Sequence, residues 1–226
     1  MGRHFLHDPL SGRLHTMATS IFSHSALLHL AFNSLALMSF GTAMNSVLKK
    51  QQASAPSGMP ESTSTYHFLS FFLSAGLFSS YVSHIVSTRI RLPILLRALL
   101  TSPAKADITP AAAASMTIAP SLGASGAIYA AVTASALAFP DANVSLIFLP
   151  FVSLPIGAGV GGMVCLDIIG IIRGWRTFDH WAHLGGAIFG VAYYNYGANF
   201  WDWVRRHTPG SHPIPFERVP PSPYVR

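Results

Sequence analysis

Charged residues divide the chain into long apolar stretches. Five windows contain no Asp, Glu, Lys or Arg, and they lie at 14–48, 62–88, 108–140, 142–166 and 180–201. Each is long enough for a membrane-spanning helix, which needs about 20 predominantly apolar residues. Within these windows the sequence predicts helices at 21–44, 66–86, 124–139, 154–172 and 181–199. The last three are rich in Gly and Ala, which is typical of helices that pack closely against their neighbours in a membrane bundle.

The segments between these helices are polar, basic or rich in proline. Residues 45–65 are interpreted as a polar loop, and residues 87–121 as a long basic loop in which 92–100 favour a short interfacial helix. Residues 140–153 begin with one proline and contain another, so they are predicted to be irregular. The chain is therefore expected to consist of a residual loop at 1–16, a membrane domain at 17–200 and a Pro-rich exposed tail at 201–226.

The overall composition strengthens the membrane interpretation. Only 10% of the residues are charged, against about 25% in ordinary soluble chains, and the mean hydropathy is +0.42. These values argue against an ordinary soluble domain, for which the alternative is a soluble all-α bundle with a large core, and they exclude disorder for most of the chain. A single cysteine excludes a disulfide framework and a Cys-based zinc site. The sequence therefore predicts an all-α, polytopic membrane helix bundle of about five transmembrane helices, in contact with the lipid bilayer.

The net charge of +6 does not indicate a nucleic-acid partner. The basic residues are dispersed and are not interleaved with aromatic residues, so they are better interpreted as the flanks of membrane segments. Alternate loops carry similar numbers of Lys and Arg, and the sequence therefore fixes neither the orientation in the membrane nor the oligomeric state.

Several polar residues lie inside the apolar windows, where each is costly and therefore informative. His29 and Asn33 are four residues apart on the first helix and share a face. Ser125 lies near the start of the third helix, and His183 near the start of the fifth. Because the first, third and fifth helices enter the membrane from the same side, Ser125 and His183 are expected at similar depth.

Two stripes of small residues predict that the third and fifth helices touch. At a spacing of four residues these stripes are Gly126, Ala130, Ala134 and Ala138 on one helix, and Ala182, Gly186 and Gly190 on the other. Such stripes let two backbones approach closely, which would bring Ser125 and His183 into hydrogen-bond range. The alternative is that these residues only pack, and that Ser125 is one more small residue.

These groups together fit the chemistry of acyl transfer. A serine attacks a carbonyl, a histidine takes its proton, and side-chain donors such as His29 and Asn33 hold the developing oxyanion. The alternative for this donor pair is an interhelical hydrogen bond that stabilises the bundle. A third interpretation is a metal or ion carrier that uses His24, His29, His180 and His183, but HExxH is absent from the sequence. We therefore expect no metal and no cofactor.

Three segments carry a more specific signal. They are His24-Ser25-Ala26-Leu27-Leu28-His29-Leu30-Ala31-Phe32-Asn33, Gly123-Ala124-Ser125-Gly126 and Asp179-His180-Trp181-Ala182-His183-Leu184-Gly185-Gly186. Together they resemble the rhomboid family of intramembrane serine proteases, in the order of its second, fourth and sixth core helices. The resemblance covers about residues 17–200 and is greatest to the mitochondrial branch, the presenilin-associated rhomboid-like proteins.

The resemblance implies roles for individual residues. Ser125 would be the nucleophile and His183 the general base and acid, in a dyad without an acidic third member. Asn33, His29 and the backbone N–H of Ser125 would form the oxyanion site. The supporting residues would be Tyr129, which packs on the catalytic imidazole, and Gly123, Gly126 and Gly186.

Two further polar residues match the family less directly. Asp167 occupies an acidic position associated with the mitochondrial branch and is expected to make a structural hydrogen bond. His180 is expected to be structural or interfacial. The helix at 154–172 would flank the lateral access route for substrate.

The resemblance implies an intramembrane serine endopeptidase that cleaves single-span membrane proteins in the mitochondrial inner membrane. The alternative is a catalytically impaired or inactive rhomboid-like protein that binds membrane clients without cutting them. The family core has six helices and the sequence predicts five, so we expect an N-terminal truncation that removes the first core helix and impairs activity. The sequence does not identify the substrate.

Overall fold

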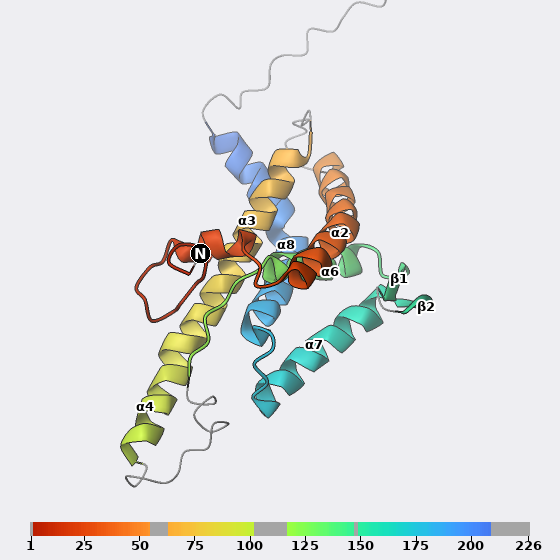
Figure 1. Cartoon of the computed structure of the whole chain (residues 1–226). Helices are drawn as coiled ribbons and strands as arrows, with labels where there is room; N and C mark the ends of the chain where they lie inside the picture. Colours follow the sequence, from red (N-terminus) through yellow and green to blue (C-terminus); the bar gives the residue numbers. More distant parts are fainter. Residues whose placement is uncertain (1, 55–62, 102–116, 147–148, 209–226) are drawn as a thin grey trace, which may run out of the picture.

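The computed structural model describes residues 2–54, 63–101, 117–146 and 149–208 (Figure 1). Within these residues the chain is almost entirely helical, as the sequence predicts. Along the chain the elements are α1 (Thr16–Thr19), a 3-10 turn (Ser20–Phe22), α2 (Leu27–Ala53), α3 (Thr65–Ile85), a π-helical segment (Val86–Arg91), α4 (Leu92–Thr101), α6 (Ser125–Ala138), β1 (Asn143–Leu146), β2 (Leu149–Pro155), α7 (Ile156–Arg173) and α8 (His180–His207).

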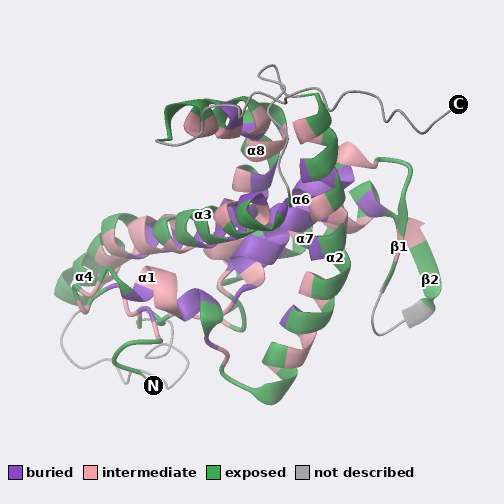
Figure 2. Ribbon diagram, turned by 90° about the horizontal axis from the view of Figure 1, so that it is seen from above, coloured by how far each residue is buried: buried purple, intermediate pink, exposed green. Residues whose placement is uncertain are grey.

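Helix α6 forms the centre of the bundle. Every residue from Gly126 to Ala136 is buried, and in Figure 2 the buried surface is concentrated on this helix and on the faces packed around it. Helices α8, α2, α3 and α7 all contact α6. Because many of its side chains are alanine, the neighbouring helices approach its backbone closely. The bulkier core side chains, such as Phe71, Met44 and Leu48, come from the surrounding helices.

The outer surface of the bundle is rich in apolar side chains. Leu28 and Met38 on α2 and Leu166 and Ile172 on α7 are all exposed. Three helical segments of the described residues are long and apolar enough to cross a membrane: Leu27–Ala53, Thr65–Thr101 and Ile156–Arg173. Helix α6 is a shorter apolar helix, enclosed by its neighbours. The chain is therefore a polytopic helical membrane protein in which α6 is shielded from lipid.

The first long helix begins and ends later than predicted. We expected it at 21–44, but α2 runs from Leu27 to Ala53. Ser23 and Ala26 are extended, with φ of −109° and −149°, and they separate α2 from the short turns before it. At the other end the helix continues through Lys49 and Lys50, which are good helix formers. A charge-free window therefore marks apolar sequence and does not mark the ends of a helix.

The start of the predicted basic loop at 87–121 is also helical. The segment predicted as a separate short helix at 92–100 is α4, and it continues α3 through the π-helical segment as one 37-residue unit. Pro93 lacks one N–H donor within this continuous helix, and the π-helical segment, with its wider hydrogen-bond spacing, ends two residues before it. Residues 102–116 of the predicted loop lie outside the described residues.

Two other expectations about the connecting segments are corrected. Residues 140–153 were predicted to be irregular, but much of this segment forms the antiparallel pair β1 and β2, in which Val144 faces Leu154. A two-stranded hairpin has free edges, so it accommodates Pro150. The tail predicted at 201–226 begins later, because α8 continues to His207. Residues 209–226 lie outside the described residues.

The N-terminal segment is attached to the bundle. His7 and Ser121 exchange backbone hydrogen bonds of 3.0 and 2.9 Å. The buried imidazole of His7 lies 2.8 Å from Thr16 Oγ1 and 3.1 Å from His84 Nδ1. Part of the segment expected to be a residual loop is therefore fixed beside the chain that leads into α6.

Candidate active site

The turn before α6 makes Ser125 the first residue of that helix. Gly123 has a φ of +119°, which favours glycine because a side chain is rarely tolerated in this region. Its N–H donates to the carbonyl of Ser20 at 2.9 Å, and Ser121 pairs with His7. The turn is therefore fixed against the N-terminal segment, and the position of Ser125 depends on this attachment.

Close packing of α6 and α8 brings the remaining groups together. A Cβ atom at Gly186 would lie only 2.1 Å from the carbonyl oxygen of Gly126, and one at Gly190 would lie 2.5 Å from that of Ala130. The predicted close contact between the two small-residue stripes is confirmed. Gly126 also faces α3, because a Cβ there would lie 2.5 Å from Ser79 Cβ.

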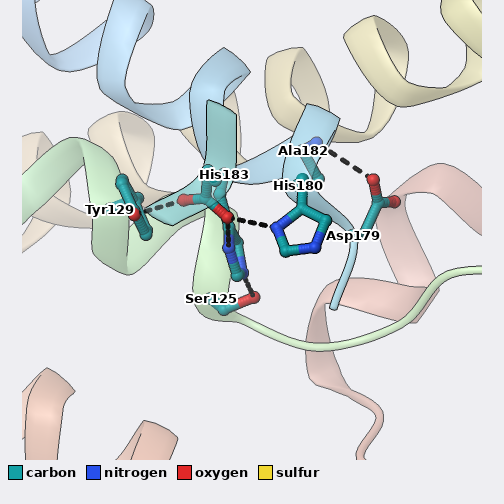
Figure 3. A network of polar contacts seen from close by, with 7 residues as sticks. Ser125, Tyr129, Asp179, His180, Ala182 and His183 are labelled. Carbon is teal, nitrogen blue, oxygen red and sulfur yellow. Dashed lines mark hydrogen bonds and ion pairs between the residues drawn. The ribbon is translucent and has the colours of Figure 1, made fainter. Parts of the chain in front are cut away.

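Ser125 and His183 meet across this contact. The Nε2 atom of His183 lies 3.0 Å from Ser125 Oγ (Figure 3). The imidazole stacks on the ring of Tyr129, with centroids 4.8 Å apart and planes inclined by 14°, and the Phe178 ring lies 6.1 Å away. The serine hydroxyl therefore faces a nitrogen that can accept its proton, and the neighbouring rings restrict the orientation of the imidazole.

An acidic residue contacts the other side of the same imidazole. Asp167 Oδ1 lies 3.1 Å from His183 Nδ1 and 2.6 Å from His180 Nδ1. The hydroxyl of Tyr129 donates to the second oxygen, Oδ2. Sequence reasoning expected one structural hydrogen bond at Asp167 and did not anticipate the contact with His183. The available signal was a lone carboxylate within an apolar helix, because such a charge needs a buried partner.

The start of α8 is fixed by a second carboxylate. Asp179 accepts a hydrogen bond from the backbone N–H of Ala182 at 3.1 Å, which caps the helix. Its other oxygen accepts from Ser83 Oγ on α3 at 2.6 Å. His183 lies one turn into α8, so this cap holds the imidazole in place relative to α3.

His29 and Asn33 border the turn that precedes Ser125. A Cβ atom at Gly123 would lie 2.9 Å from His29 Nε2 and 4.0 Å from Asn33 Nδ2. The side-chain N–H of Asn33 donates to the backbone carbonyl of His29 at 3.0 Å. An amide has two N–H groups, so the second remains for another acceptor. Both donors therefore lie next to the turn at which an oxyanion beside Ser125 would form.

The histidines of the metal-carrier alternative fall into two separate pairs. His24 and His29 stack edge to face with centroids 5.0 Å apart, and burial, followed by the neighbouring His29, lowers the pKa of His24. Within the described part of the chain, three potential metal-ligand atoms come together only at Asp167, His180 and His183, within 4.8 Å of one another. Because Asp167 lies at hydrogen-bond distance from both imidazoles, we interpret the three residues as one hydrogen-bond network.

A pocket opens beside Ser125, between α3, α6 and the start of α8. It is rich in hydroxyl groups and glycine, which suits polar groups and water better than an apolar ligand. Its lining residues are Ser20, Gly76, Ser79, Ser80, Ser121, Leu122, Gly123, Ser125, Gly126, Ala127, Asp179 and Ala182.

Comparison with known proteins agrees with this architecture. The family described as Rhomboid domain matches residues 11–199. Presenilin-associated rhomboid-like protein A, mitochondrial, of Danio rerio is 31% identical over 220 residues, which are 92% of this chain and 47% of that protein. The rat (Rattus norvegicus) presenilin-associated rhomboid-like protein, mitochondrial, is 33% identical over 198 residues, 87% of this chain and 42% of the relative. Rhomboid protein 1, mitochondrial, of Saccharomyces cerevisiae is 30% identical over 176 residues, which are 77% of this chain and 39% of that protein.

The chain belongs to the rhomboid family. It spans less than half of the length of these curated relatives. No solved structure matches it.

Proposed function

We propose that this chain is an intramembrane serine endopeptidase that cleaves single-span membrane proteins. The observation that carries the proposal is the 3.0 Å distance between Ser125 Oγ and His183 Nε2, in a chain of the rhomboid family. A serine beside a histidine, at the start of a helix and next to two side-chain donors, is suited to acyl transfer.

In the proposed reaction Ser125 is the nucleophile and His183 the general base. His183 takes the hydroxyl proton as Oγ attacks the scissile carbonyl, and then gives that proton to the leaving amine. His29, Asn33 and the backbone N–H of Ser125 stabilise the oxyanion, because donors fixed before the reaction need no rearrangement as charge develops. Water then attacks the ester carbonyl as His183 takes its proton, and the bond between the acyl carbon and Oγ breaks as His183 returns that proton to Ser125, which releases the carboxylic acid product.

The chain is an integral membrane protein, and we assign it to mitochondria because the relatives are named as mitochondrial proteins. We place it in the inner membrane. Its substrates are transmembrane proteins that reach Ser125 from within the bilayer, along the exposed face of α7.

The test is covalent labelling by a fluorophosphonate, which reacts with an activated serine, together with cleavage of a fluorogenic membrane-helix substrate in lipid nanodiscs. Ser125→Ala is expected to abolish both signals. The matched control is Ser74→Ala, an exposed serine on α3 outside this pocket, and this variant should keep both.

Labelling that persists in Ser125→Ala would refute the assignment of the nucleophile. A wild-type chain that retains membrane proteins but shows neither labelling nor cleavage would support the alternative, an inactive rhomboid-like protein that binds clients.

A further inference from the structure

A buried histidine lies in the N-terminal segment, outside the proposed catalytic pair. His7 is 1% exposed, and both of its ring nitrogens have partners. Nδ1 lies 2.8 Å from Thr16 Oγ1, and Nε2 lies 3.1 Å from Nδ1 of His84 on α3. Helix α1, which begins at Thr16, also packs on α3 (Figure 1). The side chain of His7 therefore joins the N-terminal segment to α3.

The hydrogen bonds around His7 determine where its protons lie. The Thr16 hydroxyl donates to the backbone carbonyl of Arg13, and a hydroxyl has only one hydrogen to donate. Thr16 Oγ1 must therefore accept a hydrogen bond from His7 Nδ1. Neutral His7 then has its lone pair on Nε2, so the facing Nδ1 of His84 must carry a proton and donate it. These side chains form a chain of hydrogen bonds that runs from His84 through His7 to Thr16.

This hydrogen-bond chain can hold one additional proton but not two. After a first proton has bound, one of the two rings is neutral and a single N–H still lies between them. A second proton makes both rings imidazolium, in which every ring nitrogen carries a hydrogen. Two N–H groups then face each other across 3.1 Å, where they form no hydrogen bond and the two positive charges repel. Double protonation therefore breaks the contact between His7 and α3.

Three titratable groups act on the His7 ring. They are His84 on α3, Asp8 on the same segment and Asp179 at the start of α8. Burial, and next His84, oppose a proton on the ring and outweigh the two carboxylates, so the pKa of His7 lies below its usual 6.5. A lowered histidine pKa stabilises the attached segment above pH 6.5, and this stabilisation is lost as the pH falls below it.

The same segment supports the turn that precedes Ser125. His7 and Ser121 exchange backbone hydrogen bonds of 3.0 and 2.9 Å, and the Gly123 N–H donates to the carbonyl of Ser20 at 2.9 Å. Gly123 has a φ of +119°, and a glycine without such partners has many other conformations open to it. Ser125 follows two residues later as the first residue of α6. The N-terminal segment therefore supplies the hydrogen-bond partners that fix this turn.

We propose that His7 is a positioning residue for the nucleophile, and that its contact with His84 makes the position of Ser125 sensitive to pH. With at most one additional proton bound, the segment stays attached and Ser125 Oγ lies beside His183. When both rings are protonated, the segment separates from α3 and the turn loses its support. The step takes up protons from bulk water and changes no other covalent bond. This inference rests on the proposed function.

A purely structural role for His7 is the competing explanation. Such a role would make the contact with His84 equally important at every pH. The two explanations differ for a variant that keeps the hydrogen bond but cannot take the second proton. In His84→Asn an amide N–H replaces the Nδ1–H, and rotation of the amide presents its oxygen once His7 is protonated. The segment should then stay attached at low pH.

The experiment uses the full chain in lipid nanodiscs over the range in which histidine titrates, from about pH 5 to 7.5. The rate of fluorophosphonate labelling reports on the catalytic pair. Hydrogen exchange at residues 4–20 and 117–124, corrected for the intrinsic effect of pH on exchange, reports on attachment and on the turn. The matched control is His15→Asn, which removes an exposed histidine of the same segment and leaves the hydrogen-bond chain intact.

Protonation of His183 lowers labelling at acid pH in every variant, because the general base is then charged. In the wild type and in His15→Asn we expect a further loss over the same range, together with faster exchange in both segments. Since a misplacement of about 1 Å costs about 10²-fold in rate, this further loss should approach that size. His84→Asn should show only the loss caused by His183. It should label like the wild type at neutral pH and faster than the wild type in acid.

Each outcome decides the question. Exchange in the wild type that does not rise as the pH falls overturns the inference, even if His84→Asn does not fold. Labelling that depends on pH in the same way in the wild type and in His84→Asn also overturns it. If the wild type labels at no pH, the proposed function fails. Faster exchange at 117–124 in acid, prevented by His84→Asn, would still support pH-dependent positioning of the turn.

Discussion

The contact between α6 and α8 makes Gly186→Ala the sharpest test of how the site is assembled. The added Cβ would lie 2.1 Å from the carbonyl oxygen of Gly126, whereas ordinary contact begins at 3.4 Å, so the helices would have to separate by about 1.3 Å. The neighbouring atom is backbone and cannot rotate away. Overpacking of this kind costs about 1–3 kcal/mol, which corresponds to a fall in Tm of about 2–12 °C.

The same displacement acts directly on the proposed catalytic pair. Ser125 precedes Gly126 on α6 and His183 lies one turn before Gly186 on α8, so separation of the helices lengthens their hydrogen bond. A misplacement of about 1 Å can cost about 10²-fold in rate. We therefore expect Gly186→Ala to lower both Tm and kcat, measured by thermal unfolding in detergent and by cleavage of the fluorogenic membrane-helix substrate.

Gly161→Ala on α7 is the matched control, because nothing lies within 4 Å of a Cβ at that position. In a helix alanine is more favourable than glycine by about 1 kcal/mol, so this variant should unfold at the wild-type temperature or slightly above it. A Gly186→Ala protein with the Tm and rate of the wild type would refute the idea that backbone contact between α6 and α8 sets the geometry of the site.

Three further outcomes are expected. Asn33→Ala should lower kcat by about 10²–10³-fold, the cost of one oxyanion donor, with Tm nearly unchanged; an unchanged rate would remove Asn33 from the mechanism. Gly170→Ala should lower Tm relative to Gly161→Ala, since its Cβ would lie 2.4 Å from the His180 ring; equal Tm values would contradict the packing of α7 on α8. The pKa of His7 is lowered below its usual 6.5, mainly by burial and next by the neighbouring His84. His7 therefore binds a proton more readily when the N-terminal segment is detached from the bundle than when it is attached. Attachment is therefore stable above pH 6.5 and weakens as the pH falls below it, which hydrogen exchange between pH 5 and 7.5 would detect; His7→Asn should remove this dependence.

The contact between Ser125 and His183 was accessible from sequence because local patterns encode it. Small residues at a spacing of four on two helices predict that their backbones touch, and Ser125 and His183 each lie close to one stripe. Such a pattern identifies the face by which each helix contacts the other. Once both contact faces are known, the side chains that meet across the contact can be predicted. The predicted helices at 124–139 and 154–172 correspond closely to α6 and α7, because these helices too are encoded in local sequence.

The position of Asp167 was not accessible in this way. A lone carboxylate in an apolar run indicates a buried partner, but does not say which one. The rotation of α7 about its axis depends on the hairpin before it, on Gly170 packing against His180, and on the hydroxyl of Tyr129. These are tertiary contacts between segments far apart in sequence. Sequence periodicity does not predict such contacts. The contact between Asp167 and His183 is therefore seen only in the structure.

The length of α6 affects how the proposed protease would obtain water, its second reactant. A helix of 14 residues is about 21 Å long, whereas the hydrocarbon layer is about 30 Å thick. Helix α6 is therefore too short to reach from one membrane surface to the other. Hydrolysis consumes water, which hydrocarbon does not supply. The hydroxyl-lined pocket beside Ser125 meets this requirement: it gives water molecules hydrogen-bond partners within a ring of longer helices. A short central helix would thus let the proposed hydrolysis run below the level of the headgroups.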